Sequence, residues 1–268
     1  MKKIIALTLT LVLALGMFAG CSTKNEKTIT IAASPTPHAE ILKVVQEELA
    51  KEGWTLVIKE FSDYVVPNTA TEDGSVDANY FQHGPYLETF NAENGTHLVS
   101  VAAVHYEPFG IYAGNKSDLS KIADGDKISI PNDGSNRARA LILLETQGLI
   151  KLKEGVGMEA TVLDIAENPH NLEIVEMEAA QLPNTRDSVD FAVINGNYAL
   201  GAGLNVNKDA LASEDPESVS ATTYGNILVV KKGNENTEKT KALIKAITSD
   251  AVREFIKTTY NGAVVPLF

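Results

Sequence analysis

The segment TITIAASPTPHAEILKVVQEELAKEGWTLVIKEF, residues 28–61, decides the fold. Its opening TITIAA (28–33) alternates and is rich in β-branched side chains, so it predicts a strand. Thr36-Pro37 can cap and open a helix, because proline suits the first helical position. An apolar stripe at helical spacing follows, formed by Ile41, Leu42, Val45 and Leu49. Gly53 ends this helix, WTLVIKEF (54–61) is the next strand, and the order predicts a parallel sheet covered by helices.

The same α/β alternation continues to the C-terminus. Further strands are predicted at 76–81, 97–104, 127–131, 172–177, 190–194 and 226–231, an extended segment at 108–114, and helices at 65–74, 86–94, 136–146, 239–248 and 251–260. One sheet cannot comfortably hold so many elements, so we expect two lobes. Residues 28–107 plus 226–268 would form lobe one, and residues 108–225 lobe two. Two crossovers, near Glu107-Pro108 and Tyr224-Gly225, would make a hinge with a ligand cleft between the lobes.

Residues 1–20 predict a lipoprotein signal peptide. Two lysines precede an uncharged run, 4–17, that has the length of a signal-peptide core and is too short for a comfortable membrane span. Phe18-Ala19-Gly20-Cys21 resembles a lipobox, although phenylalanine replaces the usual leucine. We therefore expect Cys21 to carry the lipid, palmitate included, and residues 21–27 to tether the domain to the outer face of the cell membrane. An ordinary signal peptide with a chance cysteine, or a short anchor helix, is the alternative.

Composition narrows the class of protein. Cys21 is the only cysteine, so the chain makes no internal disulfide and its stability must come from a packed core. The net charge is −12, and the basic residues beyond the signal peptide form no patch, which disfavours nucleic acid and anionic lipid as partners of the folded part.

Short motifs along the whole chain together resemble the methionine-binding lipoprotein family of MetQ/NlpA type. They are DYVVPN (63–68), FQHGPYL (81–87), IPND (130–133), NRARAL (136–141), GLIKLK (148–153), ENP (167–169), AQLP (180–183), VIN (193–195) and YGN (224–226). The resemblance implies a two-lobed type II periplasmic-binding fold, no catalysis and no cofactor. It also implies capture of methionine, the L-form first, for the permease and ATPase subunits of an ABC importer. Some members take D-methionine or a methionine-containing dipeptide, so family membership alone does not fix the ligand.

A free amino acid needs a cation or N–H donors for its carboxylate, acceptors for its ammonium, and an apolar slot for a thioether. Arg139 is the candidate for the carboxylate, because it lies in the first turns of a helix whose free N–H groups and dipole also favour an anion. Arg137, two positions away, would point elsewhere. A solvent-facing arginine is the common alternative; sequence alone leaves the choice even, and the family pattern favours Arg139.

Aromatic side chains provide the candidate slot for the thioether. Phe81, His83 and Tyr86 follow a strand end, and with Tyr64 they can wall a sulfur atom, which packs favourably on aromatic edges. Without the resemblance, core packing of the rings and a structural histidine would be the preferred interpretation.

Two asparagines at strand ends complete the candidate site. Asn195 ends one strand and Asn226 begins another, and an amide can offer its carbonyl to an ammonium and its NH₂ to a carboxylate. Turn formation is the alternative, above all for Asn195, which precedes a glycine. Tyr224 and Glu107, at the crossovers, are weaker candidates.

Three other functions are compatible with a chain of this class. A metal receptor is disfavoured, because none of the five histidines pair at ligand spacing, and we expect no metal site. A hydrolase is disfavoured because the sequence has no G-x-S-x-G, H-E-x-x-H or P-loop motif, and we expect no catalytic residues. A receptor of the same architecture for another small amino acid or anion is the serious alternative.

Overall fold

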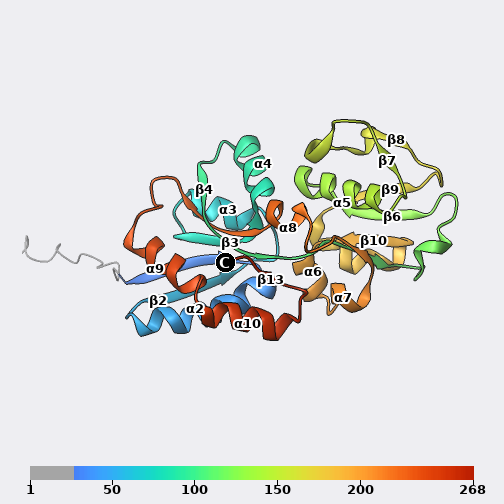
Figure 1. The fold of residues 1–268 in the computed structure, drawn as a ribbon. Helices are drawn as coiled ribbons and strands as arrows, with labels where there is room; N and C mark the ends of the chain where they lie inside the picture. The colour runs from blue at the N-terminus through green and yellow to red at the C-terminus, as the bar shows by residue number, and fades with distance from the viewer. Residues whose placement is uncertain (1–26) are drawn as a thin grey trace, which may run out of the picture.

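The computed structural model describes residues 27–268, so the predicted signal peptide, Cys21 and most of the tether lie outside the described residues. The chain forms two α/β lobes that lie side by side, each built on its own sheet (Figure 1). The sheet of lobe one has the strand order β13-β4-β12-β3-β1-β2, and that of lobe two has the order β11-β5-β10-β6-β9. The expected two-lobed α/β fold is confirmed.

The sheet of lobe one takes strands from both ends of the described chain. Its strands are β1 (Thr28–Ala33), β2 (Thr55–Glu60), β3 (Ala78–His83), β4 (Leu98–Tyr106), β12 (Asn226–Lys231) and β13 (Val265–Pro266). As predicted, β1 pairs in parallel with β2, and also with β3, whereas β12 is antiparallel to β3 and β4. The helices of this lobe are α2 (Glu40–Lys51), α3 (Val66–Glu72), α4 (Gly84–Asn94), α9 (Glu238–Ile247) and α10 (Asp250–Tyr260).

The predicted start of the first helix is one irregular turn. Thr36 is extended, with φ −127° and ψ 134°, inside the irregular helical segment η1 (Pro35–Ala39), which leads into α2. The four apolar residues predicted as the buried stripe of α2 are at most 1% exposed. They pack in one core cluster with Leu243, Ile247 and Ile256 of the two C-terminal helices. The last helices therefore belong to the same lobe as the first strand.

Lobe two lies between the two halves of lobe one in sequence. Its sheet consists of β5 (Gly110–Ala113), β6 (Lys127–Pro131), β9 (Glu173–Met177), β10 (Phe191–Ile194) and β11 (Ala210–Ser213). Its other elements are α5 (Gly134–Thr146), α6 (Gly196–Gly201), α7 (Val206–Asp209), the β7–β8 pair (Lys151–Leu152 with Ile165–Glu167), and the 3-10 turns at Leu119–Lys121, Gly157–Glu159, Val162–Asp164 and Ala179–Ser188. Leu141 and Leu144 of α5 are fully buried in the core of this lobe.

The chain passes between the sheets twice. The first passage, residues 107–109, joins β4 to β5, and the second, residues 214–225, joins β11 to β12 and contains α8 (Val219–Thr223). No helix within residues 27–268 is long and apolar enough to cross a membrane.

Candidate functional site

A cavity lies where the two lobes face each other. The cavity is partly open to solvent, and about 340 Å³ within its outline is free of atoms, open solvent included. Its walls are formed by Tyr64, Phe81, Gln82, His83, Tyr86, Glu107, Asn136, Arg139, Asn195, Gly196, Asn197 and Asn226. All seven residues predicted to bind a ligand are among them, namely Tyr64, Phe81, His83, Tyr86, Arg139, Asn195 and Asn226. The fold thus brings them together around one cavity; their contact with a ligand stays a prediction.

The aromatic wall comes from lobe one. The ring centroid of Tyr64 lies 5.7 Å from that of Phe81 and 5.5 Å from that of Tyr86. Phe81 and Tyr86 are buried and pack with Phe90 in one small cluster. Edge-on and tilted aromatic rings at these distances attract one another, so the wall is held in place without a ligand.

His83 lines the cavity, but both its ring nitrogens are engaged by the protein. Nδ1 accepts the backbone N–H of Tyr86, 3.1 Å away, so His83 caps the start of α4. Nε2 donates to Oδ1 of Asn136 at 3.0 Å. Burial lowers the pKa of His83 to about 3, and the charge of Arg139 acts in the same direction. A neutral, fixed imidazole presents its ring rather than a free hydrogen bond to the cavity.

Arg139 projects from α5 and is only 4% exposed. Its Nε and Nη2 donate to the two carboxylate oxygens of Glu214 at 2.8 and 2.6 Å, and Nη2 also donates to the carbonyl of Glu107 at 3.0 Å. Its guanidinium lies 4.3 Å from the ring centroid of Tyr224. Burial alone would lower the pKa of Arg139, but the carboxylate of Glu214 raises it, and the net shift is upward. None of these three bonds uses Nη1, which makes it the candidate donor for an anion.

The two arginines of the NRARAL motif occupy different faces of α5. Arg137 lies away from the cavity, with its Nη1 3.4 Å from Oε1 of Glu176. Asp133 caps α5 and accepts the N–H of Asn136 at 3.0 Å, so one of the N–H groups expected to be free at the helix start is already used. Because Asp133 brings a carboxylate to this helix start, the guanidinium of Arg139 is the stronger candidate for binding an anion.

Asn136 organises the asparagines of lobe two. Its Nδ2 donates to Asp133, and its Oδ1 accepts from Nδ2 of Asn195 at 2.9 Å. This bond fixes the amide of Asn195 and leaves its Oδ1 buried and without a partner in the described part of the chain. Asn226 is fixed in the opposite sense, because its Oδ1 accepts from Nε2 of His38 at 3.0 Å. Asn195 therefore offers its Oδ1 as an acceptor, and Asn226 offers its Nδ2 as a donor.

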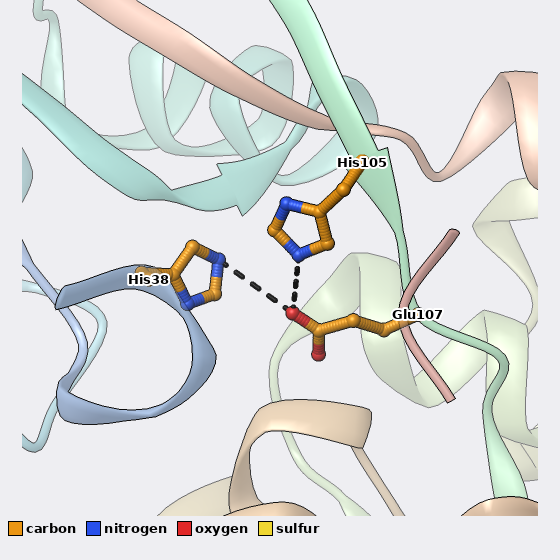
Figure 2. A group of neighbouring side chains, drawn as sticks. All are labelled: His38, His105 and Glu107. Atoms are coloured by element: carbon orange, nitrogen blue, oxygen red, sulfur yellow. Dashed lines mark hydrogen bonds and ion pairs between the residues drawn. The ribbon is translucent and has the colours of Figure 1, made fainter. Parts of the chain in front are cut away.

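Glu107 supplies a carboxylate to the cavity at the first passage between lobes. Its Oε1 lies 2.6 Å from Nε2 of His105 and 3.7 Å from Nε2 of His38, as Figure 2 shows. Burial raises the pKa of Glu107, and the nearby His38 and Arg139 oppose that shift. A Cβ added to Gly196 would lie 2.6 Å from the Cβ of Glu107, so only glycine allows this close approach.

Besides the His83–Asn136 bond, a group of tyrosine contacts joins the lobes across the cavity. The hydroxyl of Tyr64 donates to Oδ1 of Asn197 at 2.6 Å, and the hydroxyl of Tyr198 donates to the carbonyl of Ser62 at 2.9 Å. The rings of Tyr64 and Tyr198 also pack, with centroids 4.9 Å apart. We call these four residues the latch.

Sequence reasoning missed the partners that fix the predicted residues. Asn136 lay inside a quoted motif, but nothing indicated that it faces the cavity. The spacing of the histidines indicated no cluster, yet the fold brings His38 and His105 together with Glu107. Glu214, the partner of Arg139, is 75 residues away in sequence, and no local pattern links the two.

The fold and the cavity define a two-lobed solute-binding protein of the periplasmic type. A buried cavity between lobes with a few oriented polar groups is typical of small-molecule receptors. The chain belongs to the NlpA lipoprotein family, which matches residues 29–268.

Relatives and solved structures agree with this assignment. The chain is 42% identical over 276 residues to the methionine-binding lipoprotein MetQ of Bacillus subtilis, which covers 100% of this chain and 99% of that protein. It resembles the crystal structure of a lipoprotein from Ruminococcus gnavus with a TM-score of 0.89 and 57% identity, covering 90% of this chain and 100% of the other. A nutrient-binding protein from Burkholderia cenocepacia, solved bound to methionine, matches with a TM-score of 0.85 and 44% identity, again covering 90% and 100%.

Proposed function

We propose that this protein is an extracytoplasmic solute-binding lipoprotein that captures methionine, L-methionine first, and delivers it to an ABC importer. One observation carries the proposal: the cavity combines an aromatic wall with a set of unpaired polar atoms that matches a zwitterion. The names of relatives support the same ligand, since the Bacillus subtilis protein is a methionine-binding lipoprotein and the Burkholderia protein was solved with methionine.

The polar atoms divide into donors and acceptors. Nη1 of Arg139 and Nδ2 of Asn226 are the donors, and they suit the carboxylate of the ligand. Oδ1 of Asn195, a buried acceptor without a partner in residues 27–268, suits the ammonium, and the carboxylate of Glu107 adds the matching charge. A buried unpaired acceptor costs free energy, and a ligand N–H group removes that cost.

The side chain of the ligand would lie against Tyr64, Phe81 and Tyr86. A thioether is unbranched and polarisable, and sulfur gains about 0.3–1.5 kcal/mol on the edge of an aromatic ring. A branched or charged side chain gains less in the same slot. The aromatic wall therefore favours methionine over leucine, glutamate or lysine.

Delivery requires a membrane anchor and a transporter. We propose that Cys21 carries the lipid, that the tether holds the two lobes at the outer face of the cell membrane, and that the permease and ATPase subunits of a methionine importer are the partners. The role is binding, and no catalytic step is proposed. A receptor of the same fold for another small amino acid or for a methionine-containing dipeptide is the alternative.

Calorimetry on ligand-free protein tests the ligand. The mature protein is unfolded and refolded to remove bound ligand, and is then titrated with L-methionine, D-methionine, glycyl-methionine, leucine, glutamate and lysine. We expect L-methionine to bind most tightly and to add about 2.7 kcal/mol of stability at a hundredfold excess over Kd. Native mass spectrometry before stripping should show a co-purified mass equal to methionine. Tighter binding of leucine, a charged amino acid or the dipeptide would establish the alternative instead.

A further inference from the structure

A layer of buried polar side chains lies behind the cavity, on the side of lobe one. Tyr80 on β3, His105 on β4 and His38 in the segment before α2 are all 0% exposed. None of the three lines the cavity, yet each is within one or two hydrogen bonds of a residue that does. Figure 2 shows both imidazoles pointing toward the same carboxylate oxygen of Glu107.

The partners of His105 define where its protons are. Nε2 of His105 faces a carboxylate, which only accepts, so in a neutral ring Nδ1 is the acceptor and takes the hydrogen of the Tyr80 hydroxyl that contacts it. Nε2 therefore carries the hydrogen and donates it to Oε1 of Glu107 at 2.6 Å. The chain Tyr80–His105–Glu107 thus uses Oε1. The backbone N–H of Asn197 also donates to this carboxylate, which keeps lone pairs for the ammonium of the ligand.

His38 orients Asn226 in a similar way. An amide oxygen can only accept, so Nε2 of His38 carries a hydrogen and donates it to Oδ1 of Asn226 at 3.0 Å. This bond turns the Nδ2 group of Asn226 away from His38. The same Nε2 is 3.7 Å from Oε1 of Glu107, so His38 lies between the two residues that line the cavity.

Two histidines and a glutamate whose ligand atoms lie within 4.8 Å of one another could also hold a zinc ion. The hydrogen bonds disfavour this interpretation, because both Nε2 atoms already direct a hydrogen at an oxygen and offer no lone pair to a metal. In addition, Nδ1 of His38 is buried without a partner in residues 27–268. Metal bound at Nε2 would move a hydrogen to this nitrogen, where nothing accepts it.

Both imidazoles are neutral at ordinary pH. Burial lowers the pKa of His38 to about 4 and that of His105 to about 3. Each ring therefore keeps one donor and one acceptor, which is what a fixed chain of hydrogen bonds needs. The charged groups near the carboxylate of Glu107 are the guanidinium of Arg139, whose Nη2 donates to the carbonyl of Glu107, and the ammonium that the ligand would bring.

We infer that Tyr80 and His105 position the carboxylate of Glu107 for the ammonium of the ligand, and that His38 positions the amide of Asn226 for its carboxylate. The inference rests on the proposed function, because it assigns these three buried side chains to the recognition of a zwitterion. They are positioning residues, since none of them touches the ligand.

Ligands that lack one charged group distinguish the role of Tyr80 and His105 from the role of His38. The compound 4-(methylthio)butanoic acid lacks the ammonium, and 3-(methylthio)propylamine lacks the carboxylate; both keep the thioether. Tyr80→Phe and His105→Leu should weaken L-methionine about tenfold or more and the acid less than about twofold, because the acid never uses Glu107. His38→Leu should weaken L-methionine and the acid by a similar factor and leave the amine unchanged.

Conservative and remote substitutions provide the controls. His105→Gln keeps an N–H donor near Glu107 and should restore most of the affinity for L-methionine. His170→Leu, at an exposed position, should change no affinity. Circular dichroism checks folding, and Tyr80→Phe, which removes one oxygen atom, covers the case in which His105→Leu does not fold.

The outcomes distinguish the inference from the proposed function. If the wild type binds L-methionine but Tyr80→Phe and His105→Leu weaken L-methionine and the acid equally, the layer is only structural and the inference fails alone. Unchanged affinity in every variant has the same meaning. Stoichiometric zinc in the wild type that is lost in His38→Leu and His105→Leu would replace the inference by a metal site. No binding of L-methionine by the wild type would overturn the proposed function, and the inference with it.

Discussion

Removing the Arg139 side chain should weaken ligand binding and folding together, and the structure indicates how to separate them. Arg139→Ala leaves Glu214 buried without its partner; the two side chains are 5% and 8% exposed. Breaking a buried pair from one side typically costs about 3–5 kcal/mol of folding free energy. The loss of Nη1 should also weaken methionine by about 2–5 kcal/mol, roughly 30- to several thousand-fold in Kd.

A double variant distinguishes the two losses. Arg139→Met combined with Glu214→Gln removes both charges and keeps most of the volume, and replacing a buried pair by uncharged groups is often neutral for stability. We expect urea denaturation to show most of the folding free energy restored, while titration calorimetry with L-methionine still shows the full loss of affinity. Arg139→Lys should be intermediate at best, because an ammonium cannot bind Glu214 and a ligand carboxylate in one plane.

Arg137→Ala is the matched control on the same helix. Arg137 contacts Glu176 at 3.4 Å near the surface, so its removal should change stability by no more than about 0.5 kcal/mol and leave the affinity unchanged. Equal losses for Arg137→Ala and Arg139→Ala would contradict the assignment of the helix face. Recovery of affinity in the double variant would show that Arg139 acts only through folding. The asparagines would then be the groups that bind the carboxylate of the ligand.

Three further predictions follow from the same features. Cys21→Ser should accumulate as a full-length precursor or leave the membrane fraction, because a diacyl anchor supplies the two-chain strength that one acyl chain lacks; a processed, membrane-bound product would contradict the lipidation site. Burial lowers the pKa of His38 to about 4 and of His83 and His105 to about 3, so NMR should show three imidazoles still neutral at about pH 5. The unfolded chain takes up protons on these histidines first, near pH 6.5. The free energy of unfolding should therefore decrease as the pH falls from about 6.5 toward the lowered pKa values. Protonation of any of the three folded imidazoles near pH 6.5 would refute this. Tyr64→Phe removes the 2.6 Å hydrogen bond to Asn197 in the latch, which is worth about 0.5–1.5 kcal/mol. Stopped-flow traces should then show methionine release up to about tenfold faster. An unchanged release rate would mean that the latch does not hold the two lobes together around the ligand.

Local patterns were sufficient to predict most of the fold. Strand 127–131 and the helix after it were placed to within two residues, because the alternation, the Asp133 cap and the apolar positions all lie within one short stretch. The elements that were missed lack such signals. Strand β11 has four residues and a shifted register, and the 3-10 run 179–188 contains Pro183, which hides its helical period.

The residues of the candidate site were predicted mainly from the resemblance to a known family. From the residues alone, a structural histidine was the preferred interpretation of His83, and the structure shows that both its ring nitrogens are used by the protein. The bonds that orient the site join residues far apart in sequence: His38 to Asn226 across 188 positions, and Asn136 to Asn195 across 59. No periodicity within an element carries information about such pairs, because they form only when the two sheets and the passages between them are in place.

The position of Arg139 links the ligand to the hinge. The residue belongs to lobe two, yet it contacts both passages between the lobes: the carbonyl of Glu107 in the first, and the carboxylate of Glu214 and the ring of Tyr224 in the second. The aromatic wall and Asn226 belong to lobe one, so a ligand held between them and Nη1 contacts both lobes and, through one cation, both connecting segments. A rotation of the lobes that opens the cavity must therefore also disturb the contacts of Arg139. If Arg139 binds the ligand carboxylate as proposed, closure of the lobes and carboxylate binding share the same guanidinium, and this shared role would account for so costly a buried ion pair beside the cavity.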